Sequence, residues 1–506
     1  MSAPLRTVHV RIDDAGTGKP TPVRIRFSDS AGNYFAPLGR LADFATTTGQ
    51  DVGGNVLIGS EKCSYIDGNC EVKLPAGNLR VQVSKGFEYT PLDRDIALAP
   101  GQLALRLNIE RWIDLRAEGW YSGDARAHFL SPQGALLEAA AEDLAVVDLL
   151  ATRERGEGAR SSSIPNILAF SGQRPALQSE GHMVVVNTLN QHAALGRLGL
   201  LNAHRIVFPL SFGGPDQVDD WTLSDWCDQC HRKGGLVVWA EPDGEEPDGA
   251  GQGEALADLV LGKIDALEVS RIESIVPEAV GRWYHLLGAG FRVPLVGASA
   301  KTSNATPVGS IRTYAQLSKE TPFTYKAWIE SIRAGRSYVS NGPLIRLSVN
   351  GQPPGTLLDV PAGKAVQVRA DARSLRPFDR LEILFNGRSI LSAEPSGSPR
   401  KALIDQEVAL ETGGWLAAWC STDDSTTARG VERGFAHTSP IYVRVGGVTT
   451  KPDGPCVALF LRLLESTGQW IGRGGNFRKP DQRDRLLHIL RQARTVLEQL
   501  LDLSGG

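Results

Sequence analysis

The sequence has little cysteine, no long apolar run and almost no net charge. Its six cysteines in 506 residues are too few for the disulfide framework of a small secreted fold. No run approaches the roughly 18 apolar residues that a membrane-spanning helix needs, and residues 1–14 lack the basic-then-apolar pattern of a signal peptide. A formal net charge of -3 provides no general attraction for nucleic acid or an anionic membrane surface. We therefore expect a cytoplasmic protein that has neither nucleic acid nor a membrane as a partner.

The composition is that of a globular protein with several domains. Apolar residues make up 42% and charged residues 22% of the chain, which are ordinary values, and the length favours about three or four domains. Residues 1–110 contain short alternating runs, at 8–12, 23–27 and 79–83, between clusters of Gly, Pro and Asp. Alternation without helical periodicity predicts an N-terminal β-sandwich.

Residues 111–342 change to a pattern in which strands alternate with helices. Helices are expected at 131–141, 223–232, around 283–287 and at 325–333, and apolar strands at 146–150, 167–170, 183–186, 236–239, 266–269 and 293–296. This α/β alternation predicts a parallel sheet covered on both faces, and about seven such units close a barrel. Reactive groups in such barrels lie where the strands end.

Residues 343–447 return to a β pattern. The dipeptides Asn350-Gly351 and Asn386-Gly387 stand between alternating runs, and Asn-Gly at such a place is a strong hairpin signal. The stretch therefore predicts a second, immunoglobulin-like β-sandwich.

Residues 448–506 predict a C-terminal helical hairpin. The second helix carries an apolar seam at spacings of four and three, formed by Leu486, Leu490, Ala493, Leu497 and Leu500. Such a seam either packs on the neighbouring helix around 459–464 or serves a protein partner or self-association.

Several motifs in the central region carry a family resemblance. They are Gly-Trp-Tyr-Ser-Gly-Asp at 119–124, Gly-His at 181–182, Gly-Gly-Leu-Val-Val-Trp at 234–239 with Pro242, Asp-Ala-Leu-Glu at 265–268, and Gly-Arg-Ser-Tyr-Val-Ser-Asn-Gly-Pro at 335–343. Together they resemble the CehA/McbA group of metallohydrolases, which have the polymerase-and-histidinol-phosphatase (PHP) fold. The resemblance implies a distorted (β/α)7 barrel flanked by the two β-sandwiches. It also implies that His, Asp and Glu at the strand ends bind divalent metal, which activates water against an ester, carbamate or phosphoester.

The sequence departs from that pattern at most of the metal-ligand positions. The His-x-His element of the family is represented by Arg126 and His128, and the Asp-His pair after the second strand by Glu154 and Arg155. The Gly-x-Glu element ends in Arg174, the His before Pro is Glu241, and the late Asp-containing turn ends in Lys301 without a carboxylate, whereas His182 is retained. Because Arg and Lys cations do not bind a metal cation, multinuclear metal chemistry is not expected.

Three arrangements of these charges remain open. In the first, Arg126, Arg155, Arg174 and Lys301 form a closed ionic network with Asp124, Glu154, Glu241 and Glu268. In the second, some cations stay unpaired and hold a small anionic ligand such as a phosphate or carboxylate. In the third, one divalent ion (Zn, Mn or Fe) binds to His128 and His182 with help from Glu154 and Glu241.

These arrangements assign candidate roles and two alternative functions. The candidate catalytic residues are Arg126, His128, Glu154, Glu241 and Lys301, and the candidate substrate-binding residues are Asp124, Arg155, Arg174, His192 and Glu268. An isolated histidine such as His192, in a loop near the barrel mouth, is more often a hydrogen-bonded structural residue than a catalyst. The chain is either a PHP-fold protein related to metal-dependent hydrolases or a catalytically silent binding or assembly protein. The second function would use the barrel mouth as an anion site, and the sandwiches and C-terminal helices for interactions.

Overall fold

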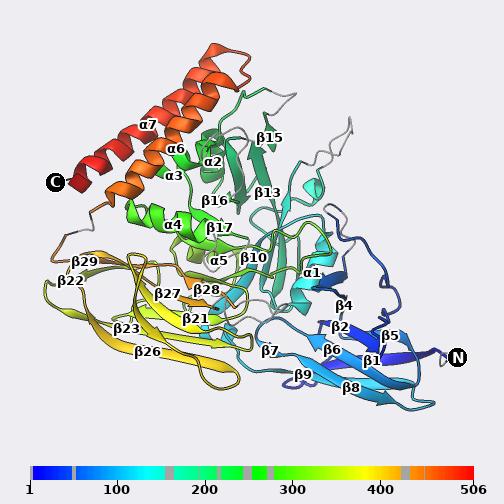
Figure 1. Ribbon diagram of the computed structural model, residues 1–506. Helices are drawn as coiled ribbons and strands as arrows, with labels where there is room; N and C mark the ends of the chain where they lie inside the picture. Colours follow the sequence, from blue (N-terminus) through cyan, green and yellow to red (C-terminus); the bar gives the residue numbers. More distant parts are fainter. Residues whose placement is uncertain are drawn as a thin grey trace.

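The structure is a computed structural model that describes residues 4–47, 49, 53–153, 164–192, 194–213, 218–242, 253–270, 278–422, 434–448 and 451–505. It is a mixed α/β protein in which strands predominate. Figure 1 shows two β-rich regions side by side at the bottom, a mixed region above them, and a pair of long helices at the top.

The N-terminal region is a sandwich of two sheets. One sheet has the order β5-β1-β9-β7 and the other the order β3-β4-β2-β6-β8. The strands are β1 (Arg6–Asp14), β2 (Val23–Asp29), β3 (Asn55–Ile58), β4 (Glu61–Ile66), β5 (Asn69–Leu74), β6 (Gly77–Ser84), β7 (Tyr89–Thr90), β8 (Leu92–Leu98) and β9 (Ala104–Arg111). Their alternating residues, such as Val8, Val10 and Ile12, are buried between the sheets, which is the arrangement that period-two alternation predicts.

The mixed region is built on a strongly curved half-barrel sheet. Its hydrogen-bonded order is β19-β10-β11-β13-β14-β16-β17-β18. The strands are β10 (Trp120–Ala127), β11 (Val146–Ala151), β12 (Leu177–Ser179), β13 (His182–His192), β14 (Gly196–Leu201), β15 (Ser211–Phe212), β16 (Leu236–Ala240), β17 (Ala266–Val269), β18 (Leu295–Gly297), β19 (Arg312–Gln316) and β20 (Ser337–Ser340). After β18 the chain returns to β10, where Ala127 bridges Lys301 and the His128 N–H donates to the Lys301 carbonyl at 2.8 Å.

Helices cover both faces of this sheet. They are α1 (Pro132–Ala141), α2 (Leu223–Arg232), α3 (Gly253–Val260), α4 (Glu278–Gly288) and α5 (Tyr325–Arg333), with short 3-10 turns η1 (Arg116–Glu118) and η2 (Ile167–Ala169). One face packs against α1 to α4 and the other against α5. Gly123 is needed for the α5 contact, because a Cβ there would lie 2.5 Å from the Trp328 ring.

Two expectations for this region are wrong. The segment 167–170 is not a strand but the 3-10 turn η2, which begins after Asn166 in the left-handed region (φ 63°) and leaves Leu168 fully exposed. The sheet is also not wholly parallel, since β14 and β19 run antiparallel to their neighbours. The predicted helices at 131–141, 223–232, 283–287 and 325–333 are confirmed.

The second β region continues the sheet of the mixed region. Its strands are β21 (Leu344–Val349), β22 (Leu357–Val360), β23 (Ala365–Ser374), β24 (Arg380–Phe385), β25 (Arg388–Ala393), β26 (Arg400–Ala409), β27 (Gly414–Ser421), β28 (Ala436–Thr438) and β29 (Ile441–Val445). A three-stranded sheet, β21-β23-β26, packs over the rest around one apolar core. The expected hairpin turn at Asn386-Gly387 joins β24 to β25, with both residues in the left-handed region. Strand β20 pairs with β19 on one side and with β28 on the other. The strands before and after residue 342, the expected end of the α/β region, therefore belong to one continuous hydrogen-bonded sheet.

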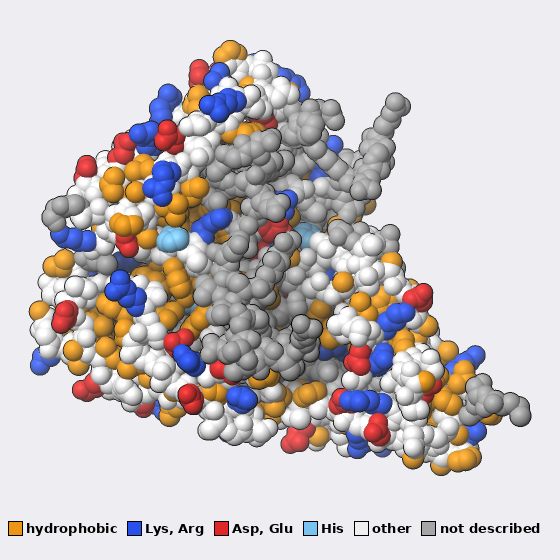
Figure 2. Space-filling model, viewed as in Figure 1, with side chains coloured by type: hydrophobic (Ala, Val, Ile, Leu, Met, Phe, Trp, Pro, Cys, Tyr) orange, Lys and Arg blue, Asp and Glu red, His pale blue; other side chains and the backbone are white. Residues whose placement is uncertain are grey.

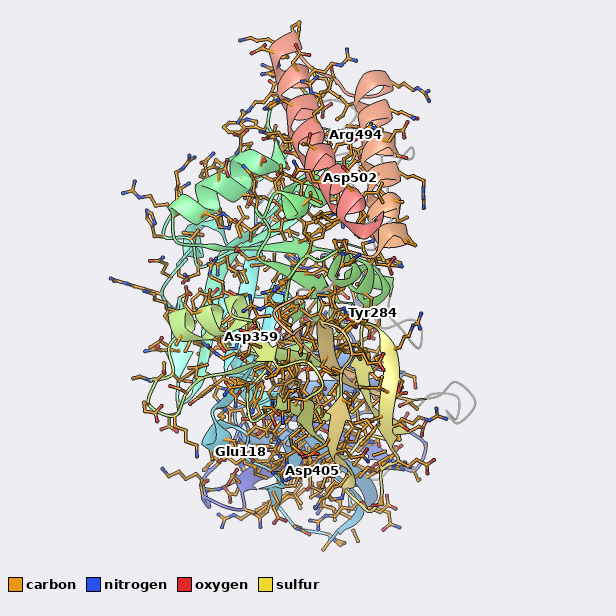
Figure 3. The ribbon with its side chains drawn as sticks, turned by 90° about the vertical axis from the view of Figure 1, so that its left-hand side faces the viewer. Glu118, Tyr284, Asp359, Asp405, Arg494 and Asp502 are labelled. Carbon is orange, nitrogen blue, oxygen red and sulfur yellow. The ribbon has the colours of Figure 1, made fainter. Side chains whose placement is uncertain are left out.

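The C-terminal helices form an antiparallel hairpin that packs on the mixed region. Helices α6 (Gly454–Arg473) and α7 (Pro480–Gly505) contact each other and also α3, and Figures 1 and 3 show the pair lying along the top of the molecule. The seam residues Leu486, Leu490, Ala493 and Leu497 are buried in the same core as α2, α3 and α4. Within the described ranges, no helix combines the length and apolarity needed to cross a membrane.

The mixed region and the second β region are also joined through side chains. Tyr284 of α4, labelled in Figure 3, lies at their contact, and its hydroxyl is 2.7 Å from His437 Nε2. Because His437 Nδ1 bonds the Thr438 carbonyl, Nδ1 carries the proton and Nε2 accepts from Tyr284. Burial lowers the pKa of His437 to about 4, so this bond keeps one tautomer at neutral pH.

Candidate functional site: a buried ion cluster at the strand ends

Arg126, near the end of β10, is held between two carboxylates. Its Nε and Nη2 donate to Glu268 at 2.9 and 2.7 Å, and Nη2 also lies 2.9 Å from Glu241 Oε1. The side chains of Arg126 and Glu268 are 4% and 2% exposed, so these charges are buried. Two parallel bonds to one carboxylate fix the plane of the guanidinium and are stronger than bonds between neutral groups.

A second arginine completes this group. Arg197, at the start of β14, pairs with the other oxygen of Glu241, because the β14–β16 register sets Arg197 opposite Ala240, the residue before Glu241. We call Arg126, Arg197, Glu241 and Glu268 the rim cluster. Its two guanidinium groups and two carboxylates cancel in formal charge.

Backbone strain marks the same end of the sheet. Phe129, Glu241 and Ala300 have φ angles of 63°, 50° and 49°, in the left-handed region that residues with a side chain rarely adopt. They follow β10, β16 and β18, so all three lie where strands end. Strain of this kind persists only where the surrounding structure holds the backbone, and it clusters at functional sites.

Among the described residues, Asp124 is bound by neutral donors and not by a cation. Its Oδ1 accepts from the backbone N–H groups of Arg126 and Ser299 at 3.1 and 2.9 Å. Its Oδ2 accepts from the Ser299 hydroxyl at 2.5 Å and the Gly309 N–H at 2.8 Å. Burial raises the pKa of Asp124, against these four hydrogen bonds, which favour the charged form. The expected pairing of Asp124 is therefore wrong for Arg126, Arg174 and Lys301, whereas Arg155 lies outside the described residues.

His128 is a neutral imidazole. Its Nδ1 lies 2.9 Å from the Leu150 carbonyl, which can only accept, so Nδ1 carries the proton and Nε2 does not. Burial, and then the neighbouring positive charge of Arg126, lower the pKa of His128 to about 3. The ring is thus uncharged over the physiological range.

Lys301 is buried beside a different carboxylate from those expected. Its Nζ donates to the carbonyl groups of Ser303 and Thr306 at 3.1 and 2.8 Å and lies 3.6 Å from Glu138 Oε2 of α1. Both side chains are fully buried. Lys301 therefore anchors the loop after β18 to α1 and stands apart from the rim cluster.

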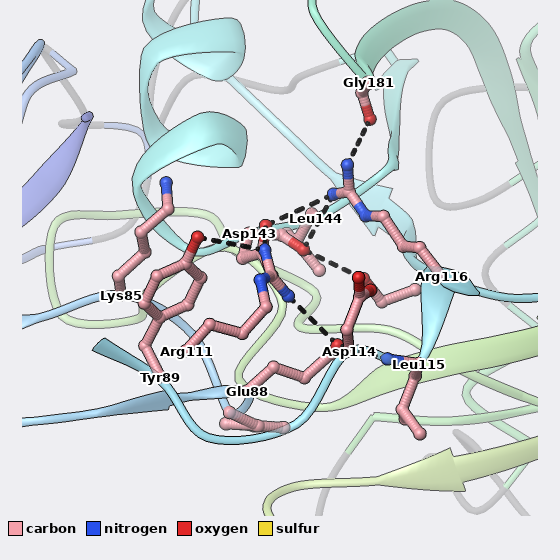
Figure 4. A network of polar contacts seen from close by, with 12 residues as sticks. Lys85, Glu88, Tyr89, Arg111, Asp114, Leu115, Arg116, Asp143, Leu144 and Gly181 are labelled. Atoms are coloured by element: carbon pink, nitrogen blue, oxygen red, sulfur yellow. Dashed lines mark hydrogen bonds and ion pairs between the residues drawn. The ribbon is translucent and has the colours of Figure 1, made fainter. Parts of the chain in front are cut away.

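The opposite end of the strands carries a separate ion network, drawn in Figure 4. Arg111 donates to Glu88 and Asp143 at 3.1 and 3.0 Å, and Arg116 donates to the Gly181 carbonyl at 3.1 Å. These contacts join the N-terminal sandwich to the starts of β11 and β13.

His182 belongs to that opposite end. It begins β13, whose Met183 pairs with Val146 at the start of β11, whereas His128 contacts Leu150 near the end of β11. Burial, and then the charge of Arg116, lower the pKa of His182 to about 4. The expected pair of His128 and His182 around one metal ion is therefore wrong, because a strand length separates them.

Two further candidates also lie outside the rim cluster. Arg174 is exposed in the turn after η2. His192 is buried at the end of β13, where its Nε2 is 2.7 Å from Asp219 Oδ1 and its Nδ1 accepts the backbone N–H groups of Ala194 and Leu195. This arrangement is that of a hydrogen-bonded structural histidine. Glu154 and Arg155 lie outside the described residues.

A buried carboxyl group lies deeper on the α5 face of the sheet. Asp148 Oδ1 accepts from the Tyr325 hydroxyl at 2.6 Å and from Asn187 Nδ2 at 2.8 Å. Burial raises the pKa of Asp148 to about 8, so the group is largely protonated at neutral pH. Its Oδ2 has no hydrogen-bond partner within the described residues.

The donors at the strand ends do not fit a divalent metal ion. Arg126 engages both Glu241 and Glu268, the lone pairs of Asp124 are used by N–H and O–H donors, and His128 adjoins a guanidinium cation. In the part of the chain that the structure describes, no group of three or more His, Cys, Asp or Glu side chains could hold a metal ion. Figure 2 shows acidic and basic side chains interspersed among the described residues of one face.

Sequence reasoning missed several residues of this region. Arg197 was outside any predicted strand, although the alternation of Leu198 and Leu200 is a period-two signal for β14. Glu138 on α1 and Ser299 after β18 carry no local signal, since their partners are distant in sequence. Comparison of the chain with protein-family models, with curated proteins and with solved structures found no match.

Proposed function

We propose that this protein is a catalytically silent binding or assembly protein on a PHP-like half-barrel, with the rim cluster in the place of a metal centre. The observation that carries the proposal is the pair of hydrogen bonds from Arg126 to Glu268, together with the ion pair of Arg126 with Glu241. A guanidinium there occupies the carboxylates that a metal ion would need as ligands. Under this proposal the protein does not bind the divalent metal ion that hydrolysis of an ester, carbamate or phosphoester would require in the CehA/McbA group.

The charge balance of the rim cluster also bears on the anion-site alternative. Arg126 and Arg197 are matched by Glu241 and Glu268, so an anion at Arg126 would have to displace a buried carboxylate. Removing one partner of a buried pair is strongly unfavourable. A closed ionic network is therefore the arrangement that the contacts favour at this position.

A protein of this kind needs no cofactor, and we propose a cytoplasmic location for it. Its near-zero net charge favours neither nucleic acid nor a membrane as a partner. Protein partners or self-association through the C-terminal helices would have to use the outer faces of α6 and α7. The seam itself is already buried against the mixed region.

Metal retention tests the proposal directly. The protein is incubated with excess Zn2+, Mn2+ or Fe2+, passed through a desalting column and submitted to elemental analysis. We expect less than about a tenth of an equivalent to be retained, and no turnover of aryl esters, carbamates or phosphoesters above the blank. The matched variants are His128→Ala, at the buried position, and His9→Ala, at an exposed one.

Near-stoichiometric retention that is lost in His128→Ala and kept in His9→Ala would overturn the proposal. Metal-dependent turnover with the same dependence on His128 would do so as well. Retention that is equal in all three proteins reports binding that uses neither histidine and leaves the candidate ligand His128 without a metal.

A further inference from the structure

Strand β26 forms an open edge of the second β region. It is the outer strand of the three-stranded sheet β21-β23-β26 (Figure 1), and within the described residues β23 is the strand that pairs with it. That ladder runs from Arg400 to Ala409 without a register shift. The strand contains neither proline nor a bulge, which are usual devices that block an edge. A further strand can therefore add to β26.

Alternate residues of β26 direct their backbone groups toward this edge. Lys401 exchanges two backbone hydrogen bonds with Ser396, each of 2.9 Å, in the turn before β26. In an antiparallel strand, the N–H and C=O groups of one residue point to the same side, so the residues with odd numbers face away from β23. Beyond Lys401, no described residue bonds to these groups. The edge-facing residues are Leu403, Asp405, Glu407 and Ala409.

The side chains along the edge are exposed and include two carboxylates. Leu403 is 57% exposed, and Asp405, Glu407 and Ala409 are exposed as well. Asp405 lies 3.8 Å from Arg369, in an ion pair at the protein surface. Glu407 forms no ion pair with a described residue. The open part of the edge therefore presents an apolar side chain followed by two negative charges.

These charges disfavour a second copy of the chain as the partner. Two copies that pair around a two-fold axis meet antiparallel, and edge-facing residues then lie opposite each other. Every such register that engages more than two edge-facing residues between Leu403 and Ala409 sets a carboxylate opposite a carboxylate of the second copy. Like charges directly opposite each other are destabilising, so the edge favours a strand of the opposite charge.

We infer that the edge of β26 binds an extended segment of another protein, in which two basic residues at alternate positions precede an apolar residue. The segment adds as an antiparallel strand, through main-chain hydrogen bonds to the edge-facing residues. Its basic side chains lie opposite Glu407 and Asp405, and its apolar side chain lies opposite Leu403.

This inference names a partner for the binding function proposed above and rests on it. The two tests remain distinguishable, because metal retention reports on the rim cluster and peptide binding reports on the edge of β26. A failure of peptide binding leaves the result of the metal experiment unchanged.

Two peptides with capped ends, added to the full-length protein, test the inference. The basic peptide is Thr-Lys-Thr-Lys-Thr-Leu-Thr, and the acidic peptide has Glu in place of both lysines. We expect saturable binding of the basic peptide alone, measured by fluorescence anisotropy of a labelled peptide. Bound peptide should also slow hydrogen exchange at the amides of Leu403, Asp405 and Glu407, which a contact through side chains alone would not do.

Two variants of one residue separate the charge from the backbone. Glu407→Lys is expected to weaken binding of the basic peptide by about fivefold or more, because it sets like charges opposite each other. Glu407→Pro removes an edge-facing N–H that β23 does not use, at a position where an edge strand tolerates proline, and is expected to weaken binding by about tenfold or more. Glu320→Lys is the matched control, since Glu320 is exposed in a turn between β19 and α5, and should bind as the wild type does.

Three results would overturn the inference. The first is no saturable binding of the basic peptide up to about 1 mM, and the second is equal binding of the basic and acidic peptides. The third is equal binding of the basic peptide by wild type, Glu407→Lys and Glu407→Pro. A mass in light scattering that rises to that of two chains, and falls to that of one chain in Glu407→Pro, would assign the edge to a second copy instead.

Discussion

Arg126 on β10 and Glu268 on β17 are joined by two hydrogen bonds across the α5 face of the half-barrel. The residues are 142 positions apart in sequence, and their strands are not neighbours in the sheet. The pair thus links two distant strands at the end where the chain also bridges from Lys301 back to Ala127. The pair therefore holds these two strands to each other at the rim cluster.

Breaking this pair should destabilise the protein strongly. Of the described carboxylates that pair with Arg126, Glu268→Ala leaves Glu241, and the loss of one partner of a buried pair costs about 3–5 kcal/mol. Urea unfolding measures the change in the free energy of unfolding. Asp93→Ala, which removes the exposed partner of Arg80, is the control and should cost less than about 1 kcal/mol. Equal losses in the two variants would contradict a buried, structural role for the rim cluster.

Asp148 should give the protein a stability that falls as the pH rises. Burial raises its pKa from 3.8 to about 8, so the folded state holds a proton that the unfolded state releases near pH 4. This contribution is full below the unfolded pKa and is lost as the pH rises through the folded pKa.

Asp148→Asn checks that pH dependence. The amide keeps an oxygen for Tyr325 and Asn187 but does not ionise. Between pH 5 and pH 9, the variant should lose less unfolding free energy than the wild type by about 1 kcal/mol or more. Parallel stability curves for the two proteins would show that Asp148 does not titrate as the burial implies.

Asp219 should control the turn of the C-terminal hairpin. Its Oδ1 binds His192 Nε2, and its Oδ2 accepts the Asn476 N–H at 2.6 Å. Asp219→Asn places an N–H donor against one of these two donors, with an expected cost of about 1–3 kcal/mol. Hydrogen exchange should show faster exchange at Asn476. Asp228→Asn is the control, because Asp228 forms a half-exposed pair with Lys263, and it should leave the exchange at Asn476 unchanged.

The hairpin seam should matter for stability and not for association. Leu497 is fully buried and Leu503 is 62% exposed. Leu497→Ala should cost about 2–5 kcal/mol, whereas Leu503→Ala should stay within about 0.5 kcal/mol. Light scattering should give the same mass for both variants as for the wild type. A change of mass caused by Leu497→Ala alone would assign the seam to an interface between chains.

Helices were predictable because their signals are local. Thr222 caps α2 by accepting the Asp225 N–H, with the Asp225 side chain bonded in return, and Thr324 caps α5 in the same position. These caps stand directly before the predicted starts at 223 and 325. Amphipathic spacing within ten residues then determines each helix.

The strand ends and the partners of the site residues could not be predicted, because they depend on contacts between distant parts of the chain. Asn187 and Asn190 interrupt the apolar pattern of β13, yet both are buried because they bond to Asp148 and to the carbonyl groups of Val207 and Pro209. The strand therefore extends beyond its predicted end and returns as β14. Likewise, Arg126 in the place of a family histidine predicted a cation at the strand ends. The second arginine that shares Glu241 with it, Arg197, and the separate position of Lys301 follow from the register of the sheet.

The unbroken hydrogen bonding from β19 through β20 to β28 has a practical meaning for dissecting the chain. A cut after residue 342 would separate β20 from β28 and leave an open edge on β20. The pairs lost are Tyr338–Thr438, Val339–His437 and Ser340–Ala436. Exposed strand edges of this sort recruit other strands. The two fragments on either side of such a cut are therefore expected to aggregate when each is expressed alone, and to remain in solution when they are co-expressed.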